Sequence, residues 1–410
     1  MNTKAKKYDI PFKKALKLTL ENIKPIKTET AFIPELPGRI TSKPVKSLVD
    51  TPSSDISLKD GYAVISDDVI KASPKKPVVL TLKGSLMAGS STKNFKVVSG
   101  TAVRIMSGAT IPKGADAVVA VEFTETSGSL VKIFNHAENG RNILKKGVDV
   151  KKGETIVGNS TRLWPPAVGL IAASGHDRAA VFKNPAVSII ATGDEILAVG
   201  QPLVKGKVFA SNLVTISSWC THYGMKSETS VVKDSESEIK KAIRHRIKKS
   251  DCLITSGGAW KGDRDLVVKI LDDLGWEKIY HRVKMGPGKA IGFGMLYSKP
   301  VFCLPGGPPS NQMAFLQLAL PGLLKLAGHG SPRLPVINAI IKDTVYGQKD
   351  WTQFIHGILT TQKDKVLFRP LNMTSRLQFM AEADAIACIP EGIDKIDKGS
   401  LIAVQLISAL

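Results

Sequence analysis

The second half of the chain alternates between two residue patterns, and this alternation constrains the fold most strongly. From residue 185 onward, short continuous apolar runs such as AVSIIAT are typical of strands buried on both faces of a sheet. They are separated by segments with helical periodicity, as in 235–250, where Ile239, Ile243 and Ile247 recur every four positions. Strands that alternate with helices predict an α/β unit with a mainly parallel sheet covered by helices on both faces.

Two β-rich segments flank this α/β unit. Residues from about 50 to 150 hold short strand-like runs broken by Gly and Pro, and residues 331–410 hold five further runs of the same kind. Within the α/β unit, the segment 277–283 predicts a single strand and the segment 311–328 predicts one last helix. The chain has 410 residues, and a domain commonly has roughly 100–200, so several domains are expected.

The charge balance points to anionic ligands. The chain has 57 Lys and Arg against 36 Asp and Glu, and its net charge of +21 attracts nucleic acid, acidic membrane or a phosphorylated substrate. Aromatic residues make up only 6% of the chain, which disfavours single-strand nucleic-acid binding by stacking. We interpret the basic stretch 240–250 as the solvated face of a helix rather than a nucleic-acid stripe.

The N-terminus and the cysteines predict a cytoplasmic protein. No apolar run reaches the ~20 residues that span a membrane, and the N-terminus lacks the apolar region of a signal peptide. Cys220, Cys252, Cys303 and Cys388 are isolated and show no metal-ligand spacing, so each is expected to be a reduced core residue.

Glycine-rich loops follow several predicted strands, where an open parallel sheet binds its ligands. These loops begin at Gly193, Gly257, Gly286 and Gly306. Glycine lets a backbone approach a ligand closely, and a helix that starts after such a loop points its N–H groups at an anion. Ser211 or Asn212 is expected to cap one of the helices. The loops together predict a site for a phosphate-type ligand.

Acidic residues in the same loops need a separate explanation, because they would repel a bare anion. Asp263 and Asp265 follow the Gly257-Gly258 loop, and Glu195 and Asp251 lie at other strand termini. Mg²⁺ placed between carboxylates and phosphates would reconcile the two charges, although Asp263 alone reads equally well as a helix cap. The Walker A and dinucleotide-binding glycine patterns are both missing, which disfavours an ATPase or a dehydrogenase.

Seven motifs follow one another along the chain. They are KDGYAV (59–64), VRIMSGATIPKGADAVV (103–119), ATGDEI (191–196), TSGGAWKGDRD (255–265), GPGKAIGFG (286–294), LPGGPPSNQMAF (304–315) and TSRLQFMAEADAIACIP (374–390). In this order they resemble the motifs of the MoeA / gephyrin E-domain family of molybdopterin molybdenumtransferases. The resemblance covers nearly the whole chain, and seven ordered motifs are far more specific than any single one.

The resemblance implies an elongated, L-shaped subunit of four domains that forms a homodimer. Domain I would be discontinuous, built from residues 1–50 and 150–182, with a β-rich domain II inserted at 51–149. Domain III, at 183–330, would be a molybdopterin-binding α/β domain with a MogA/MoaB-like fold, and domain IV, at 331–410, a C-terminal β-barrel. The active cleft would lie between domains III and IV of one subunit and domain II of the other.

The resemblance also implies the reaction, which is Mg²⁺-dependent insertion of molybdate into adenylylated molybdopterin. The adenylate is hydrolysed, and AMP and the molybdenum cofactor are released. A basic cleft would concentrate both anionic substrates. The implied partners are these small anionic substrates and a MogA-like adenylyltransferase, with neither nucleic acid nor membrane.

Family roles carried over by position give two sets of residues. The catalytic acids would be Asp60 from the partner subunit, Asp149, Glu195, Asp251 and Asp265. Glu195 and Asp265 would hold Mg²⁺, and Lys289 and Ser310 would hold molybdate. The full cofactor-binding set would be Gly257, Gly258, Asp263, Lys289, Gly306, Ser310, Ser375 and Arg376.

Some positions depart from the family pattern. They are Lys59 in place of Met, Trp260 in place of Ser, Gly286 in place of Lys, Gly307 in place of Asn and His356 in place of Arg. In one account the reaction continues with rearranged ligands, and His356 binds an oxyanion when protonated. In the other, the chain is a catalytically impaired paralogue that binds molybdopterin or a nucleotide as a carrier or scaffold. The retained acids favour an active enzyme.

Overall fold

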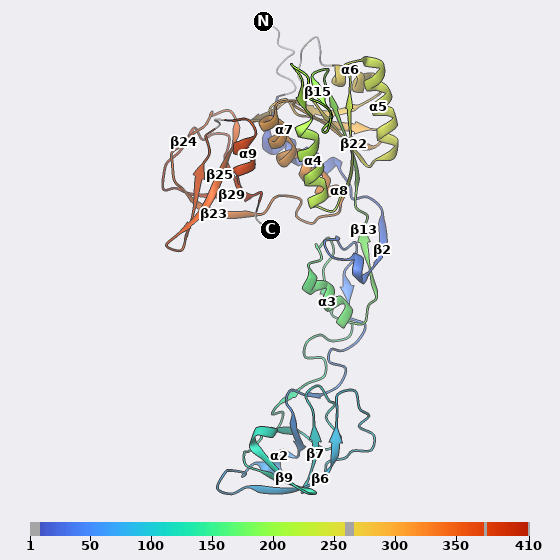
Figure 1. The fold of residues 1–410 in the computed structure, drawn as a ribbon, viewed down its shortest axis with the longest axis vertical. Helices are drawn as coiled ribbons and strands as arrows, with labels where there is room; N and C mark the ends of the chain where they lie inside the picture. The colour runs from blue at the N-terminus through green and yellow to red at the C-terminus, as the bar shows by residue number, and fades with distance from the viewer. Residues whose placement is uncertain (1–8, 259–265, 373–374, 409–410) are drawn as a thin grey trace.

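The computed structural model describes residues 9–258, 266–372 and 375–408 (Figure 1). The molecule is elongated. An α/β unit and a β unit lie side by side at one end, a narrow middle part follows, and a second β unit forms the other end. No helix in these residues is both long and apolar enough to cross a membrane.

The α/β unit is built on a six-stranded sheet in the order β17–β14–β18–β22–β21–β19. The pairs from β17 to β22 are parallel, and the last two pairs are antiparallel. In chain order the strands are β14 Ala186–Thr192, β17 Lys226–Val232, β18 Cys252–Ser256, β19 Glu277–His281, β21 Gly292–Leu296 and β22 Lys299–Leu304. The mainly parallel sheet predicted from the alternating pattern is confirmed.

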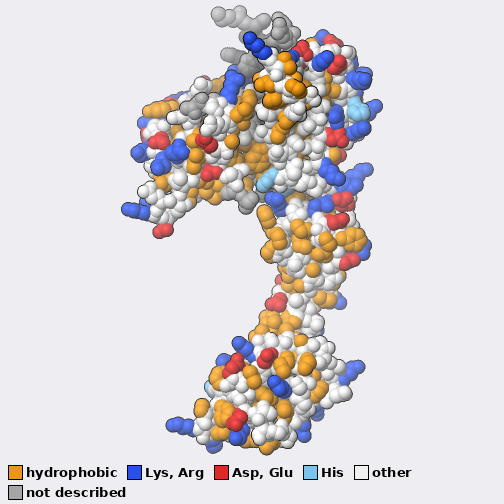
Figure 2. Space-filling view, in the orientation of Figure 1, with side chains coloured by type: hydrophobic (Ala, Val, Ile, Leu, Met, Phe, Trp, Pro, Cys, Tyr) orange, Lys and Arg blue, Asp and Glu red, His pale blue; other side chains and the backbone are white. Residues whose placement is uncertain are grey.

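Helices cover both faces of this sheet. On one face, α5 (Glu236–Lys249) and α6 (Leu266–Asp273) form a core in which Ile239, Ile243 and Ile247 are buried. Figure 2 shows Lys and Arg side chains along the outer edge, over α5. The predicted amphipathic helix is therefore confirmed. On the other face lie α1 (Phe12–Asn22), α4 (Ser211–His222), α7 (Pro308–Ala314) and α8 (Leu320–Leu326).

The segment predicted as one helix over 311–328 is interrupted. Between α7 and α8 the chain makes a π-helical turn, η4, at Phe315–Ala319. Pro321 follows this turn, and proline has no N–H to donate and a ring that clashes with the preceding turn. A wider turn accommodates that defect without ending the helix.

The segment predicted as one strand over 277–283 divides between two sheets. Arg282 has a positive φ of 72°, and after it β20 (Val283–Gly286) leaves the α/β sheet. It pairs in parallel with β1 (Ile10–Pro11) and with β25 of the C-terminal unit. This shared strand ties the two units together.

The C-terminal unit is a closed five-stranded barrel in the order β25–β26–β23–β29–β27, closed by the pairing of β27 with β25. The predicted C-terminal barrel is confirmed. In chain order its strands are β23 Val336–Ile341, β25 Thr352–Gln362, β26 Lys365–Pro370, β27 Ala385–Ile389 and β29 Leu401–Leu406, and its smaller elements are β24 Val345–Tyr346, α9 Gln378–Glu382 and β28 Lys395–Ile396.

The N-terminal helix α1 packs on the α/β unit. Its Ala15 and Leu16 are buried in that core, and the Thr19 hydroxyl lies 2.7 Å from the hydroxyl of Tyr280 on β19. The apolar face of α1 packs there, beside the point where β1 pairs with β20. The division that assigns residues 1–50 to domain I stays a prediction.

The middle part of the molecule combines two distant segments of the chain. β2 (Thr28–Phe32) pairs with β13 (Arg178–Phe182), and β3 (Val45–Lys46) pairs with β12 (Thr155–Val157). Side chains from both segments and from α3 (Pro165–Ala173) share one core. The exact domain limits stay a prediction.

The β unit at the far end of the molecule, here called the distal unit, contains a six-stranded sheet in the order β8–β5–β7–β6–β10–β9. Its elements are β5 Gly61–Val64, α2 Ser66–Val69, β6 Val78–Leu86, β7 Thr101–Ile105, β8 Ala117–Ala120, η3 Val121–Phe123, β9 Thr124–Ser127 and β10 Leu130–Ile133. β4 (Ile56–Ser57) pairs with β11 (Ile143–Leu144), and the 3-10 helix η2 (Ile33–Glu35) lies in the middle part.

Candidate active site

A cavity of about 740 Å³ lies at the carboxyl edge of the parallel strands. The ends of β14 and β18, the loop after β22 and the start of α4 line it. A short ribbon of β15 (Ile196–Leu197) and β16 (Val208–Phe209) forms another wall, and Arg376 and Leu377 reach it from the barrel unit. The cavity therefore has the position that the sequence predicted for a ligand site.

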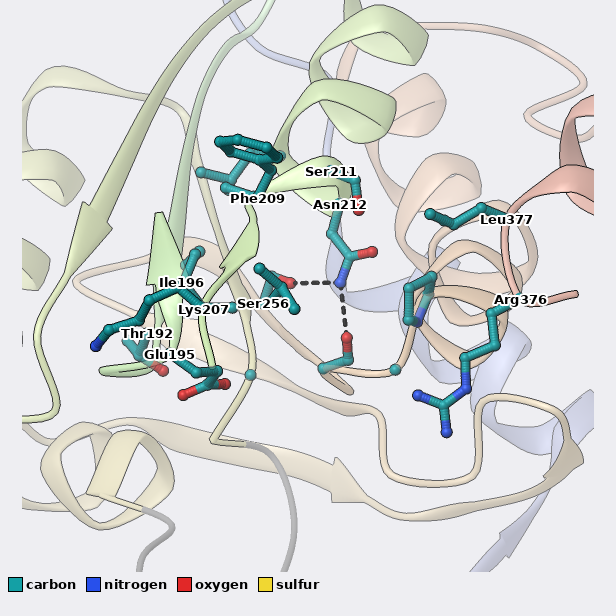
Figure 3. A pocket seen from close by; sticks show the side chains of 18 of the residues that line it. Thr192, Glu195, Ile196, Lys207, Phe209, Ser211, Asn212, Ser256, Arg376 and Leu377 are labelled. Atoms are coloured by element: carbon teal, nitrogen blue, oxygen red, sulfur yellow. Dashed lines mark hydrogen bonds between the residues drawn. The ribbon is translucent and has the colours of Figure 1, made fainter. Parts of the chain in front are cut away.

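Two asparagine amides tie the floor of this cavity together, and Figure 3 shows the bonds of the first, Asn212. Asn212, in the first turn of α4, donates through Nδ2 to Ser256 Oγ at 3.2 Å and to the Gly306 carbonyl at 2.8 Å. Asn311, in α7, donates through Nδ2 to Ser256 Oγ at 3.0 Å and to the Pro305 carbonyl at 2.8 Å. Three loops are thereby held in one geometry. The sequence suggested Asn212 as a cap of α4. The structure shows no such cap, because the Asn212 amide makes these two bonds instead.

The glycines after β18 are required first by packing within the chain. Gly257 has φ +98°, and a Cβ there would lie 2.7 Å from the Thr192 carbonyl oxygen. Gly258 has φ +61°, and its Cβ would lie 2.7 Å from Val267 Cγ2. The Gly257 N–H donates to the Leu304 carbonyl at 3.1 Å. Gly257 lines the cavity, but its N–H is already used within the protein.

Carboxylates gather at one rim of the cavity. Glu195 is exposed and lines it, and Asp194 Oδ1 accepts the N–H of Asp234 at 3.2 Å. Burial raises the pKa of the Asp234 carboxyl, and the neighbouring charges of Asp194 and Glu195 raise it further. In the part of the chain that the structure describes, no three metal-ligating side chains form a cluster. Asp263 and Asp265 lie outside the described residues, as does Trp260.

Asp251 is not at this edge of the sheet. Its Oδ2 accepts the N–H of Ala186 at 2.9 Å, and its own N–H donates to the Ala186 carbonyl at 2.7 Å. Ala186 is the first residue of β14 and Asp251 directly precedes β18, so both lie at the amino ends of these paired strands. At about 3.3 Å per residue, Asp251 is about 20 Å from Gly257. The expectation that Asp251 joins the acids of the cleft is corrected, because its carboxylate fixes the start of two parallel strands.

The predicted oxyanion residues lie on neighbouring loops. The loop that ends at Lys289 packs on α7, since a Cβ on Gly288 would lie 3.3 Å from the Ser310 carbonyl oxygen. Lys289 Nζ lies 4.8 Å from the ring centroid of Trp351, a residue of the barrel unit. Ser375 Oγ accepts the N–H of Gln378 at 2.9 Å and so supports the start of α9. Arg376 lines the cavity, and Gly306 lines its floor.

Comparison with known proteins bears directly on this arrangement. The family model described as "MoeA N-terminal region (domain I and II)" matches residues 10–175. The model described as "Probable molybdopterin binding domain" matches residues 188–325, which hold the cavity floor. The model described as "MoeA C-terminal region (domain IV)" matches residues 338–407.

Individual relatives match over most of their length. A molybdopterin molybdenumtransferase of Nostoc is 30% identical over 375 residues, which cover 90% of this chain and 86% of that protein. The chain belongs to the MoeA family. A molybdopterin molybdenumtransferase of Bacillus subtilis is 29% identical and covers 98% of this chain and 95% of its own length. The crystal structure of a MoeA protein from Pyrococcus horikoshii is 26% identical, covers 97% and 100% of the two chains and has a TM-score of 0.83.

This result confirms the family resemblance read from the seven motifs. MoeA proteins are enzymes of molybdenum cofactor biosynthesis, and several relatives carry the name of a transferase. The α/β unit with the cavity corresponds to the molybdopterin-binding part of the family.

His356 is one of the departures from the MoeA pattern, and it is not a surface cation. It is 4% exposed, its Nε2 donates to Gln312 Oε1 at 3.1 Å, and its ring packs edge-on against Phe379. Burial lowers the pKa of His356 to about 4. The expectation that it binds an oxyanion when protonated is therefore wrong near neutral pH, because the imidazole is neutral there.

The same burial predicts a pH dependence of stability. Between the usual pKa of about 6.5 and the folded pKa of about 4, the unfolded state takes up the His356 proton and the folded state does not. Stability is therefore lost as the pH falls through this window. Between pH 7 and pH 5, we expect the free energy of unfolding of His356→Gln to fall by about 2 kcal/mol less than that of the wild type. Urea denaturation at both pH values measures the difference, and equal losses would contradict the burial argument.

Two predicted acids lie far from the cavity within one chain. Asp60 precedes β5 in the distal sheet and accepts the N–H of Ser107 at 2.7 Å. Asp149 follows β11 and its N–H donates to the Thr51 carbonyl at 3.1 Å. The distal sheet is the lowest unit in Figure 1, and the cavity lies in the uppermost. One chain does not bring these acids together with Glu195.

Two polar residues near Glu195 escaped the sequence analysis. Asp234 follows the parallel strand β17, and its N–H donates to Asp194 Oδ1. Lys207 lines the cavity and donates through Nζ to the Asp194 carbonyl. It lies in a loop between two very short strands, so no periodicity marked it.

Proposed function

We propose that this protein inserts molybdate into adenylylated molybdopterin in a Mg²⁺-dependent reaction that releases AMP. The observation that carries the proposal is the cavity at the carboxyl edge of the molybdopterin-binding unit, with carboxylates at one rim and cations at another. Family membership supports the reaction class, since relatives over nearly the whole chain are named molybdopterin molybdenumtransferases.

The charge of the cavity suits an anionic substrate. Lys207 and Arg376 both line it, and the chain as a whole carries +21. In Figure 3, Glu195 and Arg376 lie on opposite sides of the Asn212 amide. A substrate with a phosphoanhydride would therefore meet Arg376 on one side, and Glu195 together with Lys207 on the other. Lys289, Ser310 and Ser375 are proposed to hold molybdate next to it.

The residues at the rim fit a hard cation. Asp194, Glu195 and Asp234 lie close enough to interact, because the charges of Asp194 and Glu195 add to burial in raising the pKa of Asp234. Mg²⁺ binds through one or two carboxylates and completes its shell with phosphate oxygens and water. Glu195 and Asp265 are proposed to hold Mg²⁺, which would polarise the phosphoanhydride and offset its charge. The residues of the chain then bind and orient the substrate.

A titration with Mg²⁺ tests this proposal. AMP release from adenylylated molybdopterin should stop in EDTA and return when Mg²⁺ is added in excess. An equal rate with and without EDTA would contradict the metal dependence. If the substrate binds tightly and releases no AMP under any metal condition, the chain is a carrier and the impaired-paralogue alternative holds.

The distant acids support a second proposal, that the active form is a homodimer with a shared cleft. Asp60 and the cavity lie in units at opposite ends of one elongated chain, so Asp60 acts on a substrate in the cavity only if a partner subunit supplies it. Mixed dimers of Asp60→Asn and Glu195→Gln chains contain one cleft with both acids intact. We expect the mixture to regain part of the AMP release that each variant lacks alone. No recovery, with mixed dimers shown by sedimentation, would contradict a shared cleft.

The reduced thiols support a cytoplasmic location. All four cysteines are free, and Cys220, Cys252 and Cys303 are buried. Burial raises the pKa of each of these thiols, which makes them inert core residues.

A MogA-like adenylyltransferase is proposed to deliver the adenylylated substrate.

A further inference from the structure

The hydrogen bonds at the cavity floor determine which polar groups remain for a ligand. A carbonyl oxygen can only accept, so the amide groups that face Gly306 and Pro305 must be the NH₂ groups of Asn212 and Asn311. This fixes the orientation of both side-chain amides. Each NH₂ has two hydrogens, and the second hydrogen of each goes to Ser256 Oγ.

Once these hydrogen bonds are counted, the Ser256 hydroxyl can act toward a ligand only as a donor. A hydroxyl has two acceptor lone pairs and one hydrogen, and both lone pairs of Ser256 Oγ already face amide hydrogens. No acceptor for the Ser256 hydrogen is found in the described part of the chain. Ser256 is 4% exposed, and the side it exposes lines the cavity. The hydroxyl hydrogen is therefore available to a ligand.

The same count leaves Asn212 as an acceptor only. Both of its Nδ2 hydrogens are used, so Oδ1 is the one group of the amide that can bind a ligand. Figure 3 shows this oxygen on the side of the amide away from Ser256. Asn311 is 2% exposed and does not line the cavity, so it supports the pair without taking part. The floor thus presents one fixed donor, Ser256, and one fixed acceptor, Asn212 Oδ1, on opposite sides of the Asn212 amide nitrogen.

The ribbon beside this pair is apolar. Ile196, Leu203, Val208 and Phe209 line the cavity there, and Phe209 is 41% exposed. Figure 2 shows hydrophobic side chains gathered at the surface around β15. An aromatic side chain at an apolar wall suits a flat ring, which it can stack on or meet edge to face.

We infer that Ser256 and Asn212 recognise the edge of a heteroaromatic ring system that carries both a hydrogen-bond acceptor and an N–H donor. The inference rests on the proposed function, whose substrate has two such rings, the pterin and the adenine. Ser256 would donate to the ring acceptor, and Asn212 Oδ1 would accept from an N–H of the ring or of its amino group. The pair would then set specificity for the ring and leave the phosphates to the cationic side of the cavity.

Calorimetric titration of the full chain with AMP and with 6-hydroxymethylpterin tests the pair and shows which ring it binds. Ser256→Ala should weaken binding of that ring by about tenfold, the effect of one hydrogen bond. Ser217→Ala is the matched control, since Ser217 is on α4 and its hydroxyl lies 2.8 Å from that of Ser227, away from this cavity. The control should bind as wild type does. Ring binding at wild-type strength by Ser256→Ala would overturn the inference.

The wild-type protein provides a second test that does not depend on the folding of a variant. Purine riboside 5′-phosphate lacks the amino donor of AMP, and ribose 5-phosphate lacks the ring. If adenine is the ring bound, both should bind about tenfold more weakly than AMP or worse. Equal binding of ribose 5-phosphate and AMP, together with no binding of the pterin, would show a phosphate site and overturn the inference. These titrations need no turnover, so they separate the ring site from the proposed reaction.

Discussion

Glu195→Gln should lower the rate of AMP release by about 100-fold or more. Glu195 is exposed at the cavity rim beside Asp194 and Asp234, where its charge is not neutralised by an ion pair in the described residues. The amide has the same shape but no charge, so a group that holds Mg²⁺ and offsets charge on the phosphoanhydride is lost. Removing one such electrostatic contact commonly costs about 10²–10³ in turnover.

Single-turnover AMP release from adenylylated molybdopterin measures this effect. Glu228→Gln is the matched control, because Glu228 is also an exposed carboxylate, lies on β17, pairs with Arg246 and does not line the cavity. That control should keep the wild-type rate and wild-type thermal stability. Wild-type turnover in Glu195→Gln would contradict a catalytic role for the carboxylate rim.

Gly257→Ala should destabilise the fold by about 3 kcal/mol. The residue has φ +98°, which an L side chain rarely adopts, and the added Cβ would lie 2.7 Å from the backbone oxygen of Thr192. Backbone atoms of β14 cannot move away as a flexible side chain can. The cavity floor next to Gly257 should also distort, so ring binding should weaken together with stability.

Gly275→Ala separates the two causes. Gly275 has a similar positive φ of +86°, but an added Cβ would meet no atom within 4 Å. Gly275→Ala should therefore lower the free energy of unfolding only by the cost of the positive φ, about 1 kcal/mol. Urea denaturation of both variants gives the comparison. Equal losses would mean that the contact with Thr192 does not limit this loop.

The sequence predicted the parts of the fold that depend on repeated apolar positions. The strand AVSIIAT and the helix with Ile239, Ile243 and Ile247 were correct because each buries a continuous face, and burial of one face imposes a period on the residues. The C-terminal barrel was implied by the family resemblance, whereas the residues themselves predicted only β-type runs there. The π-turn before Pro321 and the sheet switch at Arg282 were missed, because one residue sets each of them and no period reveals it.

The candidate site was predicted in position and less well in composition. Glycine loops at strand ends identified the correct edge of the sheet, since topology alone brings those ends together. Asp251 was misplaced because a polar residue next to a strand has the same sequence pattern whether it lies at the amino end or at the carboxyl end of that strand. His356 was misread because its burial between Gln312 and Phe379 depends on contacts across two units. Asn212 looked like a helix cap, and only the hydrogen-bond partners of Asn212 and Asn311 show that these two residues orient Ser256.

The most direct test of the account is a single incubation with product analysis. The purified chain is mixed with adenylylated molybdopterin, molybdate and Mg²⁺, and AMP and metallated cofactor are measured together. An active MoeA enzyme predicts equal amounts of the two products, each dependent on the protein and on molybdate. Substrate that remains bound and intact, with AMP no higher than in the protein-free control, would contradict the central claim.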